Sequence, residues 1–331
     1  MSSDKLVVTA SPHIRSVDSV PRIMWNVVAS LIPVVAAAAW FFGVSVLLQV
    51  SVAVLVSLLA ERATGKGGAI ADGSATITGL LLALTLPAGF PLWMTALGAG
   101  FAIVFGKQIW GGLGQNVFNP ALLGRAFLQA AFPVAITTWP AAGGNFFTLR
   151  GDLFAPPFTH PVADAVTSAT PLGLLKFEGK GTALRELIIG STGGSLGETA
   201  ALVILAGGLY LAWRGYLNWR IPVSILLTVF AFSAILHAVD PQKPNALFMI
   251  FSGGLVLGAV YMATDMVTSP GTNAGKWVFG VGIGILVVVI RVWGGLPEGV
   301  MYAILFMNAL TPFINRATQP RVFGTQLARA T

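Results

Sequence analysis

The sequence predicts an all-α polytopic membrane protein with ten transmembrane helices, arranged as two inverted five-helix repeats with some broken helices. Three observations lead to this prediction. The 331 residues are 55% hydrophobic and only 9% charged, whereas a soluble domain carries about 25% charged residues. The apolar residues form runs close to the roughly 20 residues that cross the hydrocarbon core of a bilayer. Finally, a short motif recurs in the two halves of the chain.

Ten apolar segments follow one another, some of them short or interrupted. The first five are Ile23–Phe42, Val44–Ala60, Ser74–Phe90, Leu92–Trp110 and Val117–Trp139. The second five are Glu198–Trp213, Trp219–Val239, Asn245–Thr264, Trp277–Trp293 and Pro297–Asn315. The first two segments are nearly continuous, so Gly43 must mark a tight turn. The third is short and contains Gly79 and Pro87, which predicts a broken or partly re-entrant helix that other protein segments must bury.

The two halves resemble each other at one motif. Ile109–Val117 reads Ile-Trp-Gly-Gly-Leu-Gly-Gln-Asn-Val, and Val292–Val300 reads Val-Trp-Gly-Gly-Leu-Pro-Glu-Gly-Val. Asp72 and Asp265 each open a polar segment beside a span, so we expect them to correspond in the two repeats. Five spans in each repeat force the second repeat to insert upside down, and functional sites of such folds lie near the repeat interface and its broken helices.

The positive residues set the orientation, because cytoplasmic loops carry the excess of lysine and arginine. With the N-terminus inside, the inner segments hold most of these residues and the short outer loops hold only Lys243 and Arg291. We therefore expect both termini to be cytoplasmic and the loop 140–197 to lie on the outer face. The predicted organisation is a tail (1–22), a repeat (23–139), the outer loop (140–197), a second repeat (198–315) and a tail (316–331). The N-terminal tail lacks a small-residue cleavage pattern, so it is read as retained.

The composition excludes several kinds of site. Because the chain has no cysteine, disulfides, thiolate metal sites and cysteine-ligated iron–sulfur clusters are absent. The three histidines, His13, His160 and His237, are far apart, which argues against haem or zinc. The net charge of +7 follows from basic loops beside apolar spans, so no nucleic-acid partner is expected. A redox role would need an organic cofactor.

The run Asp164-Ala-Val-Thr-Ser-Ala-Thr170 lies in the longest polar stretch of the chain. Pro171 follows and stops the run from continuing as a helix. A simple alternative is a capped helix start with Asp164 as N-cap, which explains one or two hydroxyls. It does not explain the whole pattern Asp-x-x-Ser/Thr-x-Ala-Thr, which chance yields on the order of once in a hundred chains of this size.

This pattern resembles the flavinylation motif of the family that includes the D subunit of the Rnf ion-translocating complex and the B subunit of the Na⁺-translocating NADH:quinone oxidoreductase. Three further segments resemble the same family: Asp72–Leu80, Asn116–Phe127 and Met262–Thr268. Together with the ten spans they cover most of the chain. The absence of a long N-terminal extension favours the Rnf D subunit. Ser168 departs from the family pattern, which often has glycine there.

The resemblance implies that a separate flavin transferase joins FMN through a phosphoester to Thr170. A phosphoester needs only a hydroxyl, and a tethered flavin cannot be lost to the external medium. Asp164 would position a metal ion or the hydroxyl during attachment, and Thr167 belongs to the same motif. The small residues Ser168 and Ala169 leave room for the modifying enzyme and for the isoalloxazine ring.

The resemblance also implies a second, non-covalent flavin, riboflavin, within the chain. The amides of Asn116 and Asn119 would hydrogen-bond the edge of its ring; alternatively, Asn119 before Pro120 simply caps the fifth span. Ionisable residues inside membrane spans are functional candidates. Arg125, deep in its span, would pair with an anionic reduced flavin or with a helix carboxyl end.

Two acidic residues are candidates for an ion path. Asp72 and Asp265 would contribute to it or hold the broken helices; alternatively, they are only loop acids or helix caps. The buried-charge group also contains Lys107 and Arg291.

The predicted function is that of a flavin-carrying membrane subunit of an ion-translocating electron-transport complex, which relays electrons between covalent FMN at the outer face and the second flavin. The family places this relay between ferredoxin and NAD⁺ and couples it to Na⁺ or H⁺ movement. The expected partners are the A, B, C, E and G subunits of the Rnf complex and the flavin transferase, in the bacterial inner membrane. The rival is a channel or secondary transporter without a redox role, which the predicted fold fits equally well.

Overall fold

A computed structural model describes residues 18–64, 72–157, 169–190, 192–198 and 201–320, and within these ranges every regular element is a helix. The helices of the first half are α1 (Val20–Phe42), α2 (Val44–Thr64), α3 (Ser74–Leu84), α4 (Leu92–Ile103), the π-helix η2 (Val104–Gln108), α5 (Pro120–Ala131) and α6 (Pro133–Ile136). The connection contains α7 (Pro171–Gly173), the π-helix η3 (Leu174–Glu178) and α8 (Leu184–Ile189). The second half comprises α9 (Ala201–Trp213), α10 (Arg220–Val239), α11 (Ala246–Phe251), α12 (Leu255–Leu257), the π-helix η5 (Gly258–Met262), α13 (Asn273–Trp293) and α14 (Val300–Ala317).

The turn expected between the first two spans is present at Gly43. This residue has a positive φ of 75°, which glycine adopts at no steric cost. Its N–H donates to the carbonyl of Ala39 at 2.8 Å, and a Cβ placed on it would collide with the carbonyl oxygen of Phe146. The turn therefore requires glycine for two independent reasons.

The third predicted span is interrupted, as its glycine and proline indicated. Helix α3 stops at Leu84, and residues 85–90 continue without a helix before α4. The carbonyl of Pro87 accepts a hydrogen bond from the Gln49 side chain at 2.8 Å. The N–H groups of Leu196 and Gly197 donate to the carbonyls of Leu86 (3.1 Å) and Leu84 (2.7 Å). The protein itself thus satisfies the backbone groups that the break releases, as a lipid solvent requires.

The second half contains a matching interruption that the sequence interpretation missed. Between α11 and α12 the chain passes through Ser252, Gly253 and Gly254, and Gly253 has a φ of 68°. The guanidinium of Arg291 donates to the carbonyls of Met249 (2.5 Å) and Ser252 (2.9 Å). A single arginine of α13 thus satisfies the carbonyls at the end of α11.

Helix α2 shows that the solvent of this fold is apolar. Its buried residues include Ser45, Gln49 and Glu61, whereas Leu55 and Leu59 on the same helix are 57% and 58% exposed. A water-soluble helix would bury the leucines and expose the carboxylate. Within the described residues, four helices are long and apolar enough to cross a bilayer: α1, α2, α10 and α13. The chain is therefore a polytopic membrane protein.

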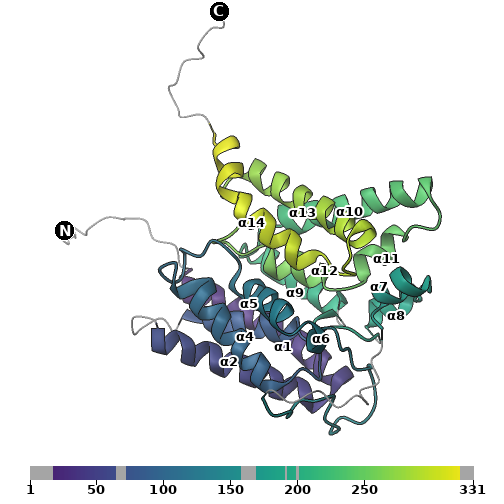
Figure 1. The fold of residues 1–331 in the computed structure, drawn as a ribbon. Helices are drawn as coiled ribbons and strands as arrows, with labels where there is room; N and C mark the ends of the chain where they lie inside the picture. The colour runs from purple at the N-terminus through teal and green to yellow at the C-terminus, as the bar shows by residue number, and fades with distance from the viewer. Residues whose placement is uncertain (1–17, 65–71, 158–168, 191, 199–200, 321–331) are drawn as a thin grey trace, which may run out of the picture.

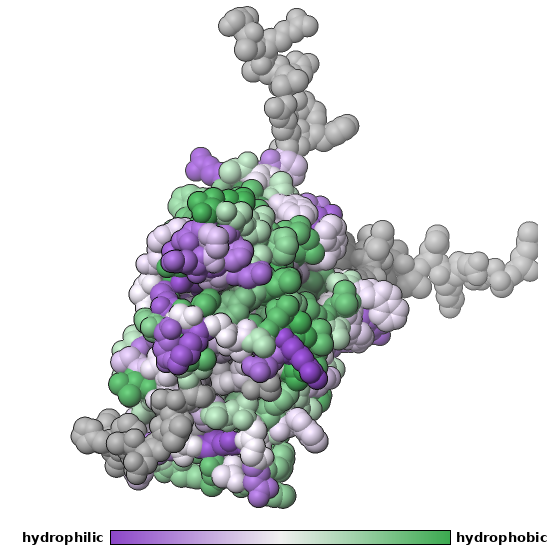
Figure 2. Space-filling view, turned by 90° about the vertical axis from the view of Figure 1, so that its right-hand side faces the viewer, coloured by the Kyte–Doolittle hydropathy of each residue, from purple (hydrophilic) through white to green (hydrophobic). Residues whose placement is uncertain are grey.

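The two halves occupy separate regions and pack in similar ways. Figure 1 shows the helices from α1 to α6 in its lower part and α10 to α14 in its upper part, with α9 between them. Helix α2 packs on α4 and α4 packs on α5; likewise α10 packs on α13 and α13 packs on α14. Helix α1 of the first half packs on α9 of the second. Helices α7 and α8 lie to the right in Figure 1, away from the C-terminal end of α14. Figure 2 looks onto that right-hand side, where hydrophilic patches alternate with apolar areas.

Candidate functional site

Thr170 begins the short helix α7. Its backbone is extended (φ −65°, ψ 154°), and its Oγ1 accepts a hydrogen bond from the N–H of Gly173 at 3.1 Å. Pro171 occupies the first helical position, where its missing N–H costs nothing. Thr170 is therefore the N-cap of α7, whereas the alternative that Asp164 caps a helix start falls outside the described residues. Asp164, Thr167 and Ser168 lie outside the described residues, and Ala169 is exposed.

Thr170 also opens into a cavity of about 390 Å³, which is within the size range of small-molecule sites. We call it the outer cavity, after the predicted outer loop 140–197 that contributes Thr170 to its wall. It is formed by the C-terminal part of α5, the end of α6, the segment from residue 169 to 178 and the loop between α13 and α14. Its lining consists of Arg125, Gln129, Ile136, Thr137, Trp139, Ala169, Thr170, Gly173, Phe177, Glu178, Gly295, Leu296, Pro297 and Glu298.

Lys176 fixes the Thr170 segment to the second half of the chain. Its ammonium donates to the carbonyls of Arg291 (2.9 Å), Gly294 (2.5 Å) and Leu296 (3.0 Å). These carbonyls lie at the C-terminal end of α13, where a cation is favourable. Burial lowers the pKa of the Lys176 ammonium. The three hydrogen bonds hold α7 and η3 against the α13–α14 loop, and so hold Thr170 at the cavity.

Four charged side chains meet beside the outer cavity, and we call them the outer charge cluster: Arg125, Glu198, Arg291 and Glu298. Arg125 donates from Nη2 to Glu298 Oε2 at 2.9 Å, and the N–H of Gly254 donates to Glu298 Oε1 at 3.3 Å. Glu198 lies beside the same glycine, since a Cβ added at Gly254 would be 3.9 Å from Glu198 Oε1. Arg291 approaches Glu298 at Gly253, where an added Cβ would lie 3.0 Å from Arg291 Nη2 and 2.8 Å from Glu298 Oε1.

Arg125 carries an unused donor in this cluster. The residue is only 8% exposed, as its deep position in the fifth span predicted. Its Nε is buried and has no hydrogen-bond partner among the described residues. A buried N–H without a partner costs about 1–3 kcal/mol, and Arg125 lines the outer cavity. The outer cavity is therefore suited to an anionic ligand.

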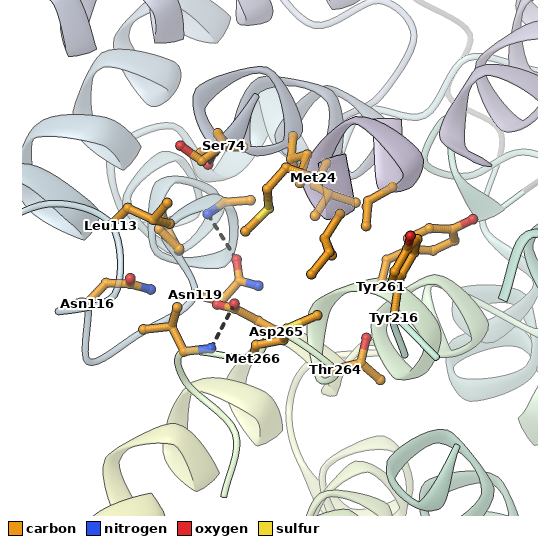
Figure 3. A pocket seen from close by; sticks show the side chains of 18 of the residues that line it. Met24, Ser74, Leu113, Asn116, Asn119, Tyr216, Tyr261, Thr264, Asp265 and Met266 are labelled. Atoms are coloured by element: carbon orange, nitrogen blue, oxygen red, sulfur yellow. Dashed lines mark hydrogen bonds between the residues drawn. The ribbon is translucent and has the colours of Figure 1, made fainter. Parts of the chain in front are cut away.

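A second cavity, which we call the inner cavity, lies between α1, α3, the start of α5, η5 and the loops that follow α9 and η5 (Figure 3). Its volume is about 100 Å³. The polar side chains on its wall are Ser74, Thr78, Lys107, Asn116, Asn119, Tyr216, Tyr261, Thr264 and Asp265. The structure thus brings Asn116, Asn119 and Asp265 together there, whereas Asp72 does not line this cavity and Arg125 lines the outer one.

Asn119 caps α5, one of the two roles considered for it. Its Oδ1 accepts from the N–H groups of Ala121 (3.0 Å) and Leu122 (3.3 Å). Its Nδ2 donates to the carbonyl of Met262 at 3.1 Å, which connects α5 to η5 of the second half. The amide of Asn119 is therefore already engaged within the protein. Asn116 Nδ2 donates to the carbonyl of Phe118 at 3.2 Å.

Asp72 and Asp265 have similar local roles. Asp72 Oδ1 accepts from the N–H (2.8 Å) and the hydroxyl (2.6 Å) of Ser74. Asp265 Oδ1 accepts from the N–H of Val267 at 3.2 Å and its Oδ2 from the hydroxyl of Thr268 at 3.2 Å. Each carboxylate thus stabilises the turn that follows it, as the cap alternative expected. An ion-path role for either residue stays a prediction.

A buried ion pair adjoins the inner cavity. The Lys107 ammonium donates to Glu61 and to Ser74, and both partners of the ion pair are almost fully buried. Glu61 Oε2 has no partner among the described residues. The sequence interpretation included Lys107 among the buried charges but did not identify Glu61, which lies just beyond the predicted span Val44–Ala60 and in the last turn of α2.

Helix α5 connects the two cavities. Its first residues, Pro120 and Ala121, line the inner cavity, and Arg125 lines the outer one. A rise of 1.5 Å per residue separates Ala121 from Arg125 by about 6 Å along the helix axis. On α5, the lining residues of the two cavities are thus separated by little more than one helical turn.

Comparisons with known proteins give a consistent result. A model of the NQR2, RnfD, RnfE family matches residues 7–324. The chain is 40% identical to the D subunit of the proton-translocating ferredoxin:NAD(+) oxidoreductase complex of Clostridium ljungdahlii, covering 96% of each chain. It is 40% identical to the D subunit of the Na(+)-translocating ferredoxin:NAD(+) oxidoreductase complex of Acetobacterium woodii, over 98% of this chain and 97% of that one. The D subunit of the ion-translocating oxidoreductase complex of Stutzerimonas stutzeri is 42% identical, over 92% of each.

Proposed function

The chain belongs to the NQR2, RnfD, RnfE family, and we propose that it is the flavin-carrying membrane subunit of an ion-translocating ferredoxin:NAD⁺ oxidoreductase complex. It would relay electrons between FMN joined to Thr170 in the outer cavity and a second flavin in the inner cavity. One observation carries the proposal: the last threonine of the motif opens into a cavity where a buried arginine has an unused donor.

The outer cavity suits FMN in three respects. Thr170 supplies the hydroxyl for a phosphoester although the residue is only 5% exposed. Gly173 leaves space at that hydroxyl, since a Cβ there would lie 3.2 Å from Thr170 Oγ1. Arg125 would hold the phosphate, and Trp139 and Phe177 offer aromatic walls for the isoalloxazine. When bound, FMN supplies the electron-transfer chemistry that the side chains of the protein lack.

The inner cavity suits riboflavin less well. Lys107 and Asn116 offer hydrogen-bond donors, which match the carbonyls of an isoalloxazine edge. The volume of about 100 Å³ is below the 300–1,000 Å³ of typical ligand sites. Binding therefore requires apolar side chains such as Met24 and Leu113 to move outward. The proximity of the two cavities along α5 supports this position for the second flavin, because electron transfer needs closely spaced cofactors.

We further propose the ten-span architecture with two inverted repeats, residues 23–139 and 198–315. Interruptions in the third and eighth predicted spans, and the matching packing of α2, α4 and α5 with α10, α13 and α14, support it. In this orientation both termini are cytoplasmic and Thr170 faces the outside of a bacterial inner membrane. The partners would be the A, B, C, E and G subunits of the complex, with a flavin transferase for maturation.

Similarity to the relatives does not identify the ion that this chain's complex would translocate. The relatives from Clostridium ljungdahlii and Acetobacterium woodii are named for protons and for sodium ions, and both are 40% identical to this chain. Their names also favour the redox function over a transporter without electron transfer. Asp72 and Asp265 remain our candidates for the ion path.

A fluorescent band on a denaturing gel tests the covalent flavin. The protein would be co-expressed with its flavin transferase as parent, Thr170→Val, Thr170→Asn and Thr167→Val. Asparagine retains a capping side chain but lacks the hydroxyl, so it separates attachment from folding. We expect fluorescence in the parent and Thr167→Val, and none in either Thr170 variant. Fluorescence that survives in both Thr170 variants, or a non-fluorescent protein from the native host, would refute the proposal.

A further inference from the structure

Glu198 and Glu298 lie beside each other at Gly254. The N–H of Gly254 donates to Glu298 Oε1 at 3.3 Å, and a Cβ added at Gly254 would lie 3.9 Å from Glu198 Oε1. Neighbouring carboxyls away from bulk water disfavour double ionisation, so one of the two holds a proton. Glu298 accepts from Arg125 and from the N–H of Gly254, contacts that favour its ionised form. Glu198 accepts from the hydroxyl of Ser195 at 2.7 Å, a neutral donor. The geometry therefore places the proton on Glu198 and the negative charge on Glu298.

With this protonation, the outer charge cluster has a surplus of one positive charge. Arg125 and Arg291 contribute two positive charges and Glu298 one negative charge, while Glu198 is neutral. Both arginines are buried, and an uncompensated buried charge is unfavourable. A phosphodiester on Thr170 would add one negative charge and bring the site to neutrality. This count rests on the proposed function.

A further negative charge in the outer cavity would then need its own compensation. Arg125 is the link, because its Nη2 binds Glu298 while its Nε has no partner among the described residues and the side chain lines the outer cavity. Glu298 lines the same cavity, so protons from the outer medium have access to it. We propose that Glu198 and Glu298 form a proton-binding site that takes up one proton for each negative charge added to the group held in the outer cavity.

The step balances in charge. A low-potential iron–sulfur donor protein delivers one electron to the cavity and is itself oxidised by one electron. One proton from the outer medium forms an O–H bond on the Glu298 carboxylate, and Arg125 turns its released N–H toward the new negative charge. Oxidation reverses both changes and frees the proton. Both carboxyls are then protonated only while the site is reduced.

The described surroundings contain few other groups able to take this proton. Arg125 approaches from α5 and Arg291 from α13, and neither guanidinium loses its proton in proteins. From η3, the ammonium of Lys176 is bound to three carbonyls at the end of α13. Ser195 supplies only a hydroxyl. Glu178 of η3 also lines the cavity, but its side chain is 47% exposed and pairs with Lys180 at 2.9 Å, so solvent and the lysine already stabilise its charge. Glu298, on the α13–α14 loop, is therefore the shielded base that faces the cavity.

Infrared difference spectroscopy of the purified whole complex tests this site. Reduced-minus-oxidised spectra would be recorded in H₂O and D₂O for the parent, Glu298→Gln, Glu198→Gln and Glu186→Gln. Glu186 is an exposed carboxylate of α8 and serves as the control. We expect reduction of the parent to produce a carboxylic-acid C=O band that shifts in D₂O. The band should be lost in Glu298→Gln and kept in Glu186→Gln. Glu198→Gln should also keep it, because glutamine can still donate to residue 298.

Two outcomes would overturn the site. One is a reduced parent without a new carboxylic-acid band, and the other is a band that persists in Glu298→Gln. The fluorescent band on a denaturing gel, recorded for every sample, shows that each variant carries its covalent flavin, and its co-purification with the complex shows that it folds and assembles. Fluorescence without the carboxyl band overturns this inference and leaves the proposed function intact. A parent without fluorescence overturns both.

Discussion

Arg125 of α5 and Glu298, 173 positions later in the chain, form an ion pair of 2.9 Å beside the outer cavity. The pair joins the two halves of the protein directly. Its side chains are 9% and 17% exposed, so water stabilises each charge only weakly and the partner charge stabilises it strongly. Removing one partner from such a pair typically costs about 3–5 kcal/mol, whereas removing both costs much less.

We therefore expect Arg125→Leu and Glu298→Leu each to lower the free energy of unfolding by about 3–5 kcal/mol. The double variant should lose less unfolding free energy than the two single variants lose together. Thermal unfolding in detergent measures all four corners of this cycle. The exposed pair Lys180–Glu178 at 2.9 Å is the control, with an expected coupling below about 1 kcal/mol. Equal couplings for the two pairs would contradict the account.

The turn at Gly43 gives a second prediction. Alanine there collides with the carbonyl oxygen of Phe146, in addition to the cost of a positive φ. Gly179 has a similar φ of 68° but no atom within 4 Å of a Cβ. Gly179→Ala should cost about 1–2 kcal/mol, and Gly43→Ala clearly more, because the α1–α2 turn must open. Thermal unfolding of the two variants compares them; equal losses would mean that the clash is relieved without cost.

Lys176 should keep the segment from residue 169 to 178 anchored against the end of α13. Lys176→Met keeps the length of the side chain but removes three hydrogen bonds to the end of α13. A hydrogen bond from a charged group contributes about 1.5–3 kcal/mol. We expect amide hydrogen exchange in residues 172–178 to accelerate at least about tenfold. Lys180→Met, at a lysine whose side chain is 74% exposed, should leave this exchange unchanged.

Tyr216 provides a prediction on pH. Its hydroxyl donates to Asp18 Oδ1 at 2.8 Å, and this hydrogen bond is the main cause of the raised pKa of Tyr216. Because the folded-state pKa is above the usual value of about 10, the contact is fully present below a pH of about 10. It is lost as the pH rises through the raised pKa.

An ultraviolet titration of tyrosinate measures this effect, since the chain has only four tyrosines. The difference between the parent and Tyr216→Phe should titrate above a pH of about 10. The Asp18→Asn variant removes the acceptor charge and should bring that titration back toward the usual pKa. A difference spectrum that titrates at or below the usual pKa in the parent would contradict the contact.

The sequence predicted those features of the fold that depend on neighbouring residues. Gly43 between two apolar runs, Pro87 in a short span and Asn119 before Pro120 each produced the expected turn, break or cap. The interruption at Ser252–Gly254 was not expected, because the segment around it is uniformly apolar and the compensating donor, Arg291, lies 39 residues beyond Ser252. Its only local signal was the pair of glycines after Ser252.

The outer charge cluster could not be predicted for the same reason. Glu198 and Glu298 are 100 positions apart, and each stands at the start of a predicted apolar span, Glu198–Trp213 or Pro297–Asn315, where it drew no functional prediction. Only the folding of the two halves against each other makes them neighbours. Lys176 likewise looked like a residue of a long outer loop, although it binds the end of α13. Thr170 could be singled out as a candidate because its motif is contiguous in sequence.

The most direct test of the central claim is the mass of the peptide that contains Thr170. The complex would be purified from its native membrane, digested and analysed by tandem mass spectrometry. The account predicts a peptide heavier by FMN minus one water, with the added mass on Thr170 and none on Thr167. An unmodified Thr170 peptide at full yield, or the added mass on another residue, would contradict the claim that this threonine carries the flavin.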